Sequence, residues 1–150
     1  MLRDDLQNAL KESMKNKDMN TVGAVRLIIA GMKEKDVDAR GKGQEKASDA
    51  DLMAMMQSMI KQRNDSIKMY IDGNRPELAE KEKYEISVIE RFLPKQMNEA
   101  EIENAVKALI AETGAASMKD MGKVMGALKA KYAGQLDMGK ANAVIKGLLN

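Results

Sequence analysis

Apolar side chains recur at three- and four-residue steps over most of the chain, which is the spacing of one face of an α-helix. A first series covers residues 2–10, and a second runs from residue 22 to residue 32. The longest series runs from residue 52 to residue 71, and a fourth from residue 78 to residue 93. No segment shows the sustained period-two alternation of a half-buried strand. The pattern predicts an all-α protein.

Residues that start and stop helices divide the first part of this pattern. Asp18 is a predicted N-cap of the second helix, and Ser48 with Asp51 forms a capping-box pattern before the third. Gly73 is expected to end the third helix, and Pro94 follows the fourth. Residues 36–48 are rich in charge and poor in apolar side chains, so we expect a mobile loop there.

Three shorter apolar series follow Pro94, each with its own start and stop signals. The expected caps are Asn98 with Glu101, Ser117 with Asp120, and Asp137, and the expected stops are Gly114 and Gly134. We therefore predict two domains. Residues 1–96 form a hairpin assembly of about four helices, and residues 97–150 form a small three-helix bundle.

The 150-residue chain contains no Cys and no His, which excludes disulfides and any catalytic mechanism that needs either residue. Cys and His are also the commonest zinc ligands, so we expect no metal site, and we expect no cofactor. The N-terminal residues show no secretory signal, and the longest apolar run, residues 27–30, is too short to span a bilayer. These observations predict a cytoplasmic protein without a membrane segment.

Catalytic groups are not assembled in any recognisable pattern. A serine nucleophile of the amidase type would lie in a Gly/Ser-rich loop. The serines of this chain are scattered instead, so they do not form such a loop. Glu82 and Glu85 lie one helical turn apart, as paired acid and base groups do, but Lys81 and Lys83 lie beside them. We interpret this segment as a solvated, salt-bridged helix face and expect a protein that works by binding.

Four of the 14 methionines lie close together on the third helix, at Met53, Met55, Met56 and Met59. Flexible, polarizable methionines either fill an irregular core or line an adaptable docking groove. We favour the core because several of them lie on the apolar stripe, which Met53 fits least well. The docking surface remains the alternative, and it would make the protein a helical protein–protein adaptor or regulator.

Lys61, Arg63 and Arg75 are secondary candidates for contact with an anion. Arg63 falls on the apolar stripe of the third helix, four residues after Met59 and four before Ile67. An Arg in such a position either pairs with a carboxylate inside the helical assembly or faces an anionic ligand, and we favour the internal pair.

Charge is unevenly distributed near the C-terminus. Residues 119–150 hold six Lys and two Asp, a local net charge of +4. Gly122, Gly126 and Gly139 would let a sugar–phosphate backbone approach closely, and helix N-termini near Ser117 and Asp137 would add N–H donors. An ordinary solvated lysine face explains the same composition, so both interpretations stay open. The candidate nucleic-acid-binding residues are Lys119, Lys123, Lys129, Lys131, Lys140 and Lys146.

Several short motifs, in order along nearly the whole chain, resemble those of the YqeY family. They are residues 61–67 (KQRNDSI), 77–82 (ELAEKE), 85–89 (EISVI), 92–96 (FLPKQ) and 119–126 (KDMGKVMG). The resemblance implies an N-terminal helical region followed by a three-helix domain. It also implies kinship with the helical tail of the B subunit of the aspartyl/glutamyl-tRNA amidotransferase, which contacts tRNA.

This kinship implies tRNA as a partner, and it makes an amidotransferase a candidate protein partner. It does not carry catalysis over, because the reaction takes place in other domains of that enzyme. A carbon–nitrogen ligase assignment with glutamine as amido donor would rest on kinship alone. Residues 121–126 match the signature shared with that tail, and among them Lys123 is the residue with a phosphate-binding group.

Overall fold

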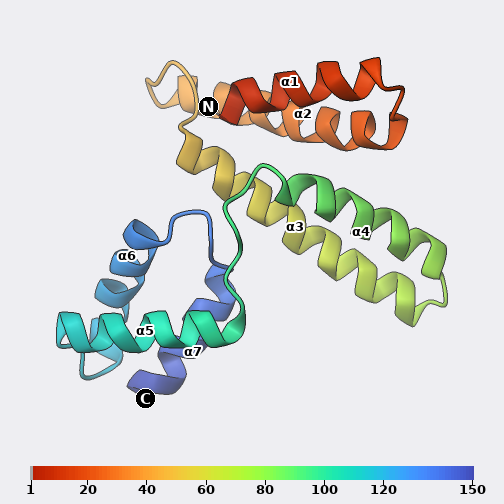
Figure 1. The fold of residues 1–150 in the computed structure, drawn as a ribbon. Coiled ribbons are helices and arrows are strands. Elements are labelled where there is room, and N and C mark those ends of the chain that lie inside the picture. Colours follow the sequence, from red (N-terminus) through yellow and green to blue (C-terminus); the bar gives the residue numbers. More distant parts are fainter. Residues whose placement is uncertain (1) are drawn as a thin grey trace. The chain divides into compact units, whose positions relative to one another are not determined.

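The computed structural model of the chain describes residues 2–150 (Figure 1). Within this range all regular secondary structure is helical and no strand occurs, which confirms the predicted all-α class. None of the described helices combines the length and apolar character needed to cross a bilayer. The elements are α1 (Leu2–Lys15), α2 (Met19–Gly41), α3 (Asp49–Asp72), α4 (Pro76–Glu90), α5 (Glu99–Thr113), a 3-10 turn (Met118–Asp120), α6 (Met121–Lys131) and α7 (Met138–Leu149).

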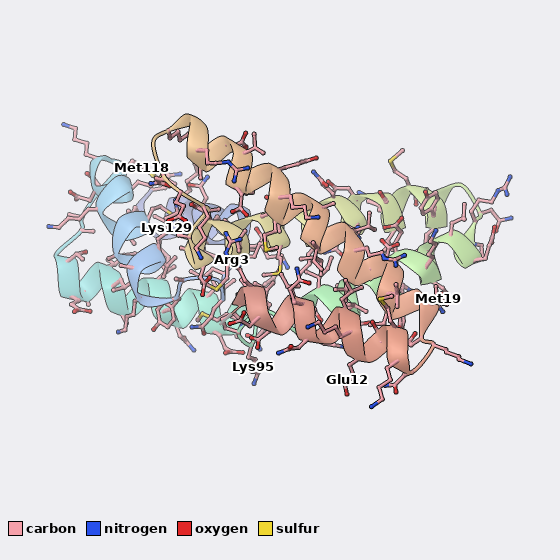
Figure 2. All side chains as sticks on the ribbon, turned by 90° about the horizontal axis from the view of Figure 1, so that it is seen from above. Arg3, Glu12, Met19, Lys95, Met118 and Lys129 are labelled. Carbon is pink, nitrogen blue, oxygen red and sulfur yellow. The ribbon has the colours of Figure 1, made fainter. Side chains whose placement is uncertain are left out.

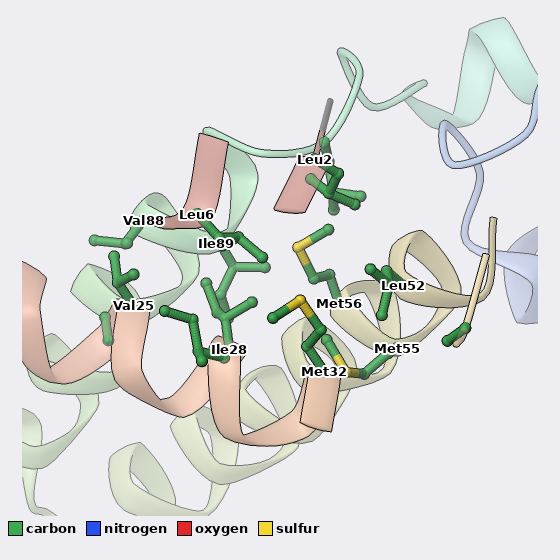
Figure 3. Close-up of a cluster of buried hydrophobic side chains, with 14 of the residues drawn as sticks. Leu2, Leu6, Val25, Ile28, Met32, Leu52, Met55, Met56, Val88 and Ile89 are labelled. Carbon is green, nitrogen blue, oxygen red and sulfur yellow. The ribbon is translucent and has the colours of Figure 1, made fainter. Parts of the chain in front are cut away.

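The chain divides into two compact units between Leu93 and Pro94. In the N-terminal unit α1 packs against α2, α3 packs against α4, and α2 contacts both α3 and α4. Leu6, Ile28, Leu52 and Ile89 are among the fully buried side chains that join these helices in one core (Figure 3). All four helices of this unit therefore depend on shared apolar burial rather than on local propensity alone.

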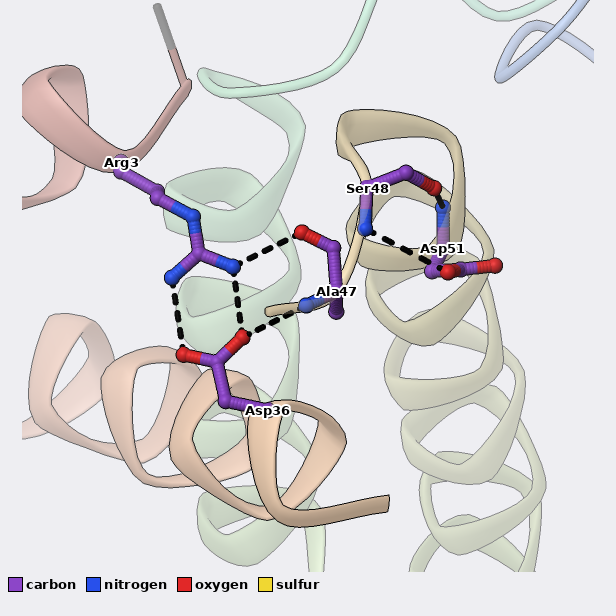
Figure 4. A network of polar contacts seen from close by, with 5 residues as sticks. All are labelled: Arg3, Asp36, Ala47, Ser48 and Asp51. Carbon is purple, nitrogen blue, oxygen red and sulfur yellow. Dashed lines mark hydrogen bonds and ion pairs between the residues drawn. The ribbon is translucent and has the colours of Figure 1, made fainter. Parts of the chain in front are cut away.

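The second helix is longer than the sequence predicts. The expected loop over residues 36–48 is wrong for residues 36–41, because α2 continues to Gly41. Asp36 accepts hydrogen bonds from Nη1 and Nη2 of Arg3 at 2.8 and 2.6 Å and from the Ala47 N–H at 2.9 Å (Figure 4). Ala39 is buried on the same helix. Contacts with residues distant in sequence thus stabilise a segment whose local composition favours a loop.

Most of the predicted caps are confirmed. Asp18, Ser48, Asn98 and Asp137 each accept a backbone N–H from the first turn of the following helix. Ser48 and Asp51 form the complete capping box (Figure 4). The end of α5 is set by Gly114, whose φ of 71° lies in the left-handed region that glycine adopts without strain.

The four clustered methionines of α3 belong to the core, as favoured from the sequence. Met55 and Met56 are buried (Figure 3). Met53 and Met59 are partly buried and pack against the same cluster. Met53 is therefore not the exposed side chain that its poor fit to the stripe suggests. These four side chains do not form a Met-rich docking surface, because they already pack against the protein's own helices.

A groove of about 740 Å³ runs between α2 and α3 in the N-terminal unit. Its lining mixes apolar and charged side chains, among them Leu27, Asp38 and Met55. Gly31 forms part of this lining, and a Cβ atom there would lie 2.8 Å from the sulfur of Met55. The Met55 side chain thus occupies the space that a side chain at position 31 would take, and it would have to shift to accept one.

In the C-terminal unit α5, α6 and α7 each contact the other two helices. Their core includes Ile102, Val106, Leu128 and Ile145. The segment after Pro94 belongs to this unit, since the side-chain amide of Gln96 donates to the Gly134 carbonyl at 2.6 Å. The unit therefore has its own apolar core, and its two basic helices hold fixed positions on it.

Candidate nucleic-acid interface

All six lysines predicted as nucleic-acid contacts are exposed in the structure, and Figure 2 labels one of them, Lys129. They come from the 3-10 turn, from α6 and its C-terminal end, and from α7. Lys129 and Lys146 make no ion pair within residues 2–150, so their ammonium groups stay free to meet a ligand. The helix α5 of the same unit carries four exposed glutamates and one lysine, so an anionic ligand is attracted to α6 and α7 and repelled from α5.

The outward face of α6 combines charge with an unusual lack of side-chain bulk. Val124 and Leu128 face the core, whereas Gly122, Gly126 and Lys129 lie on the opposite side of the helix at four- and three-residue steps. A Cβ atom added at Gly122 or Gly126 would meet nothing within 4 Å. Glycine at such a helical position costs stability relative to alanine, and packing within this protein does not require it.

The helix α7 repeats this arrangement. Ala141 and Ile145 face the core, and Gly139, Ala143 and Lys146 follow one another on the opposite, exposed side. Gly139 and Lys146 are among the residues identified from the sequence, whereas Ala143 is not. The signal that could have identified it is the four-residue step from Gly139, which places a second small residue on the same face. Both basic helices thus present lysine next to small residues on their solvent side.

Two of the six lysines already have partners within the chain. Lys123 donates to the carbonyl of Thr113 at 3.2 Å and so satisfies a free carbonyl at the C-terminal end of α5. The ammonium of Lys131 lies 5.7 Å from the ring centroid of Tyr132, within cation–π range. Lys123, which the family motif singles out, therefore has a structural role, and Lys129 and Lys146 are better reporters of binding.

The helix N-termini do not supply the open N–H donors expected from the sequence. The carboxylate of Asp137 accepts the N–H groups of Gly139 and Lys140, at 2.9 and 3.2 Å. Asp120 accepts the N–H groups of Ala116 and Ser117, and these hydrogen bonds hold the pKa of its carboxyl below the usual value. A phosphate at either position would meet a carboxylate, so we place the candidate interface on the outward faces of the helices instead.

The secondary candidates differ in their surroundings. Nε of Arg63 donates to Glu85 at 2.8 Å and lies 3.9 Å from Glu82, and Nη1 donates to the Met59 carbonyl. The predicted internal pairing of Arg63 is confirmed. The expected lysine-paired, solvated face is wrong for Glu82 and Glu85, because both carboxylates turn toward α3 and contact this one guanidinium.

Lys61 and Arg75 remain exposed. Arg75 lies 3.9 Å from Glu77, with both side chains more than 60% accessible, and such pairs contribute little to stability. Lys61 makes no ion pair among the described residues. Across residues 2–150, acidic side chains form no group of three arranged to hold a metal ion.

The curated proteins that this chain resembles come from yeasts. It is 39% identical to a Candida glabrata protein over 88 residues, which cover 59% of this chain and 47% of the relative. It is 34% identical to a Lachancea thermotolerans protein over 110 residues, which cover 72% of this chain and 57% of the relative. Both are named "Altered inheritance of mitochondria protein 41, mitochondrial". The chain thus spans about half the length of these relatives.

These names contradict the cytoplasmic location expected from the sequence. A third relative with the same name, from Vanderwaltozyma polyspora, is also described as mitochondrial. The expectation rested on the lack of a secretory signal and of a bilayer-spanning run. Neither feature separates the two compartments, because a protein in the mitochondrial matrix needs neither a secretory signal nor a bilayer-spanning run.

The family itself is established by a match that extends almost from end to end. Residues 3–149 fit the family model described as "Yqey-like protein". The matched range includes all five motifs identified in the sequence and all seven α-helices of the structure. This chain is a member of the YqeY family.

Proposed function

We propose that this protein binds tRNA through the outward faces of α6 and α7 and acts as an accessory protein without chemistry of its own. The observation that carries the proposal is the pairing of free lysines with exposed glycines that the fold does not require, at Gly122, Gly126 and Lys129. Lysine supplies the attraction to phosphate, and the missing side chains let a bulky sugar–phosphate backbone reach the helix.

The mode of binding follows from the side chains at hand. The outward faces of α6 and α7 carry ammonium groups but no arginine fork and no stacking platform apart from the half-buried Tyr132. Such a surface recognises the charge and shape of a folded RNA rather than its base sequence. The family resemblance to the amidotransferase tail makes tRNA the first RNA to test. A complex with an amidotransferase is a further candidate, for which tRNA would be the shared ligand.

A double variant tests the proposed interface. Lys129→Gln with Lys146→Gln removes two free charges from the outward faces of α6 and α7 while leaving the core intact. We expect weaker binding of total tRNA and a salt dependence shallower by about 1.4 to 1.8 in log K against log salt, because two phosphate contacts are lost. Fluorescence anisotropy titrations of labelled tRNA between 50 and 200 mM salt measure both quantities.

The matched control is Lys95→Gln with Lys107→Gln. It removes the same charge from exposed positions of the same unit, outside α6 and α7. The control protein should bind tRNA with nearly unchanged affinity and salt slope. Equal losses in the two variants would reduce the effect to net charge, and unmeasurable binding by the unmodified protein would refute the proposal.

A glycine substitution should separate stability from binding. Gly126→Leu adds bulk at a helical position with open space around it, so we expect stability to rise by roughly 0.5–1 kcal/mol. The same side chain would hold an RNA backbone away from α6, so tRNA affinity should fall. Ala108→Leu adds similar bulk to an exposed position of α5 and should leave affinity unchanged. Thermal unfolding and anisotropy titrations give the two readouts, and undiminished binding by Gly126→Leu would argue against close approach at α6.

A further inference from the structure

The helix α2 carries a second exposed seam that the candidate interface does not include. Its positions follow one another at steps of three and four residues, so they share one face of the helix. None of them is buried, and the side of α2 that packs into the core lies elsewhere. The seam consists, in order, of Gly23, Arg26, Ala30, Lys33, Val37 and Arg40.

The seam alternates cations with small or apolar residues. Arg26, Lys33 and Arg40 recur every seven residues, so their side chains form a row about 21 Å long on one face of the helix. Between them lie Ala30 and Val37, and the side chain of Val37 is 59% exposed. The positions one turn away from Arg26 hold no carboxylate, which is where a helix usually places an acidic partner.

Two of the three cations of this seam, Arg26 and Lys33, are not used by the fold, whereas the charge of Arg40 acts on Asp36. Arg26 and Lys33 make no ion pair within residues 2–150, whereas Arg3 and Arg63 of the same unit hold carboxylates at 2.6 and 2.8 Å. Asp36, one helical turn from Lys33 and from Arg40, already accepts two hydrogen bonds from Arg3. The exposed Glu34 and Asp38 of α2 lie beside the seam and line the groove toward α3. Arg26 and Lys33 therefore face solvent as free cations, and the acidic groups near them either pair with Arg3 or line the groove.

The same composition recurs on the proposed interface. On α6 the small residues Gly122 and Gly126 precede Lys129 at steps of four and three, and on α7 Gly139 and Ala143 precede Lys146 in the same way. All of these positions are exposed, and none of the lysines on these faces is paired with a carboxylate. The pattern on α2 thus offers the same two properties, free positive charge and close approach of a backbone.

We propose that the α2 seam is a second phosphate-binding track, so that one RNA molecule contacts both units of the protein. The proposal deepens the proposed function and rests on it for the identity of the ligand. The proposed interaction is electrostatic: a linear row of cations would face the regularly spaced phosphates of an RNA strand or helix edge. Base recognition is not part of it, because the seam carries no aromatic residue.

The double variant Arg26→Gln with Lys33→Gln tests this seam in the full chain. Both side chains are exposed and unpaired, so the variant should unfold like the unmodified protein. We expect tRNA affinity at 150 mM salt to fall about 10-fold and the salt slope to become shallower by about 1.4 to 1.8. The matched control is Lys11→Gln with Lys15→Gln, which removes two exposed charges from α1, and its affinity should change less than about 2-fold.

The outcomes separate this inference from the proposed function. Full affinity in the α2 variant, with weak binding in Lys129→Gln/Lys146→Gln, would overturn the second track and leave the C-terminal interface standing. Weak binding in the α2 variant alone would support RNA contact at α2, but it would overturn the C-terminal interface and with it the claim that one RNA contacts both units. Weakening in both variants, with both controls unchanged, supports two contact surfaces. Equal weakening in the α2 variant and its α1 control would attribute the loss to net charge and overturn the track.

Discussion

Replacing Met56 by Lys is expected to unfold the N-terminal unit. The side chain of Met56 has no exposed surface and lies in the core between α2, α3 and α4. An ammonium group there would have neither water nor a carboxylate partner, which costs more than about 4 kcal/mol. Because whole domains are stable by only about 5–15 kcal/mol, we expect a large loss of helical signal and of the unfolding midpoint in far-UV circular dichroism.

Met69 provides the matched control on the same helix. Its side chain is 72% exposed, so Met69→Lys should change the free energy of unfolding by no more than about 0.5 kcal/mol. The difference between the two variants tests the assignment of the α3 methionines to the core. Comparable unfolding curves for both variants would mean that Met56 faces solvent and would restore a docking surface on α3.

The second large effect is expected at Asp36. Asp36→Ala removes the acceptor of three hydrogen bonds that join α1, α2 and the segment before α3 (Figure 4). It also leaves the guanidinium of Arg3 without its carboxylate partner. Charge-assisted hydrogen bonds of this kind contribute about 1.5–3 kcal/mol, so we expect a destabilisation of about 2–3 kcal/mol in urea unfolding.

The same contact predicts how stability depends on pH. The hydrogen bonds from Arg3 lower the pKa of Asp36 from 3.8 to about 2 in the folded protein. Because the folded pKa lies below the unfolded one, this contribution is fully present above about pH 4 and is lost as pH falls toward 2. Asp36→Ala should therefore lose less stability than the unmodified protein between pH 5 and 2.

Asp38 is the control for this experiment. It lies two residues further along α2, is exposed and makes no ion pair among the described residues. Asp38→Ala should keep both the stability and the acid sensitivity of the unmodified chain. If Asp36→Ala and Asp38→Ala unfold alike at pH 7, the contact between Arg3 and Asp36 does not stabilise the junction of α1, α2 and α3.

The helices themselves follow from local sequence signals. The three- and four-residue apolar steps and the caps at Asp18, Ser48, Asn98 and Asp137 correctly predict where most helices lie and begin. These signals are local, since each acts within one helical turn. The last part of α2 is not predicted from the sequence because it depends on the contact between Asp36 and Arg3. Arg3 lies 33 residues before Asp36, outside any window of local sequence.

Side-chain partners were predictable only in part. An internal pair is predictable for Arg63 because a cation on an apolar stripe needs a partner. The sequence does not identify that partner, since Glu82 and Glu85 lie beside lysines on their own helix. Spacing along one helix cannot show which face meets another helix. Similarly, the candidate lysines follow from composition, whereas the partner of Lys123 and the open space around Gly122 and Gly126 required the packed structure.

The central claim is that tRNA contacts the outward faces of α6 and α7, and lysine footprinting tests it most directly. The unmodified protein would be acetylated with and without saturating tRNA, and each lysine would be quantified by mass spectrometry. We expect Lys129 and Lys146 to be protected by tRNA, and the exposed Lys95 and Lys107 of the same unit to react equally in both samples. Equal reactivity of Lys129 and Lys146 with and without tRNA would contradict the account.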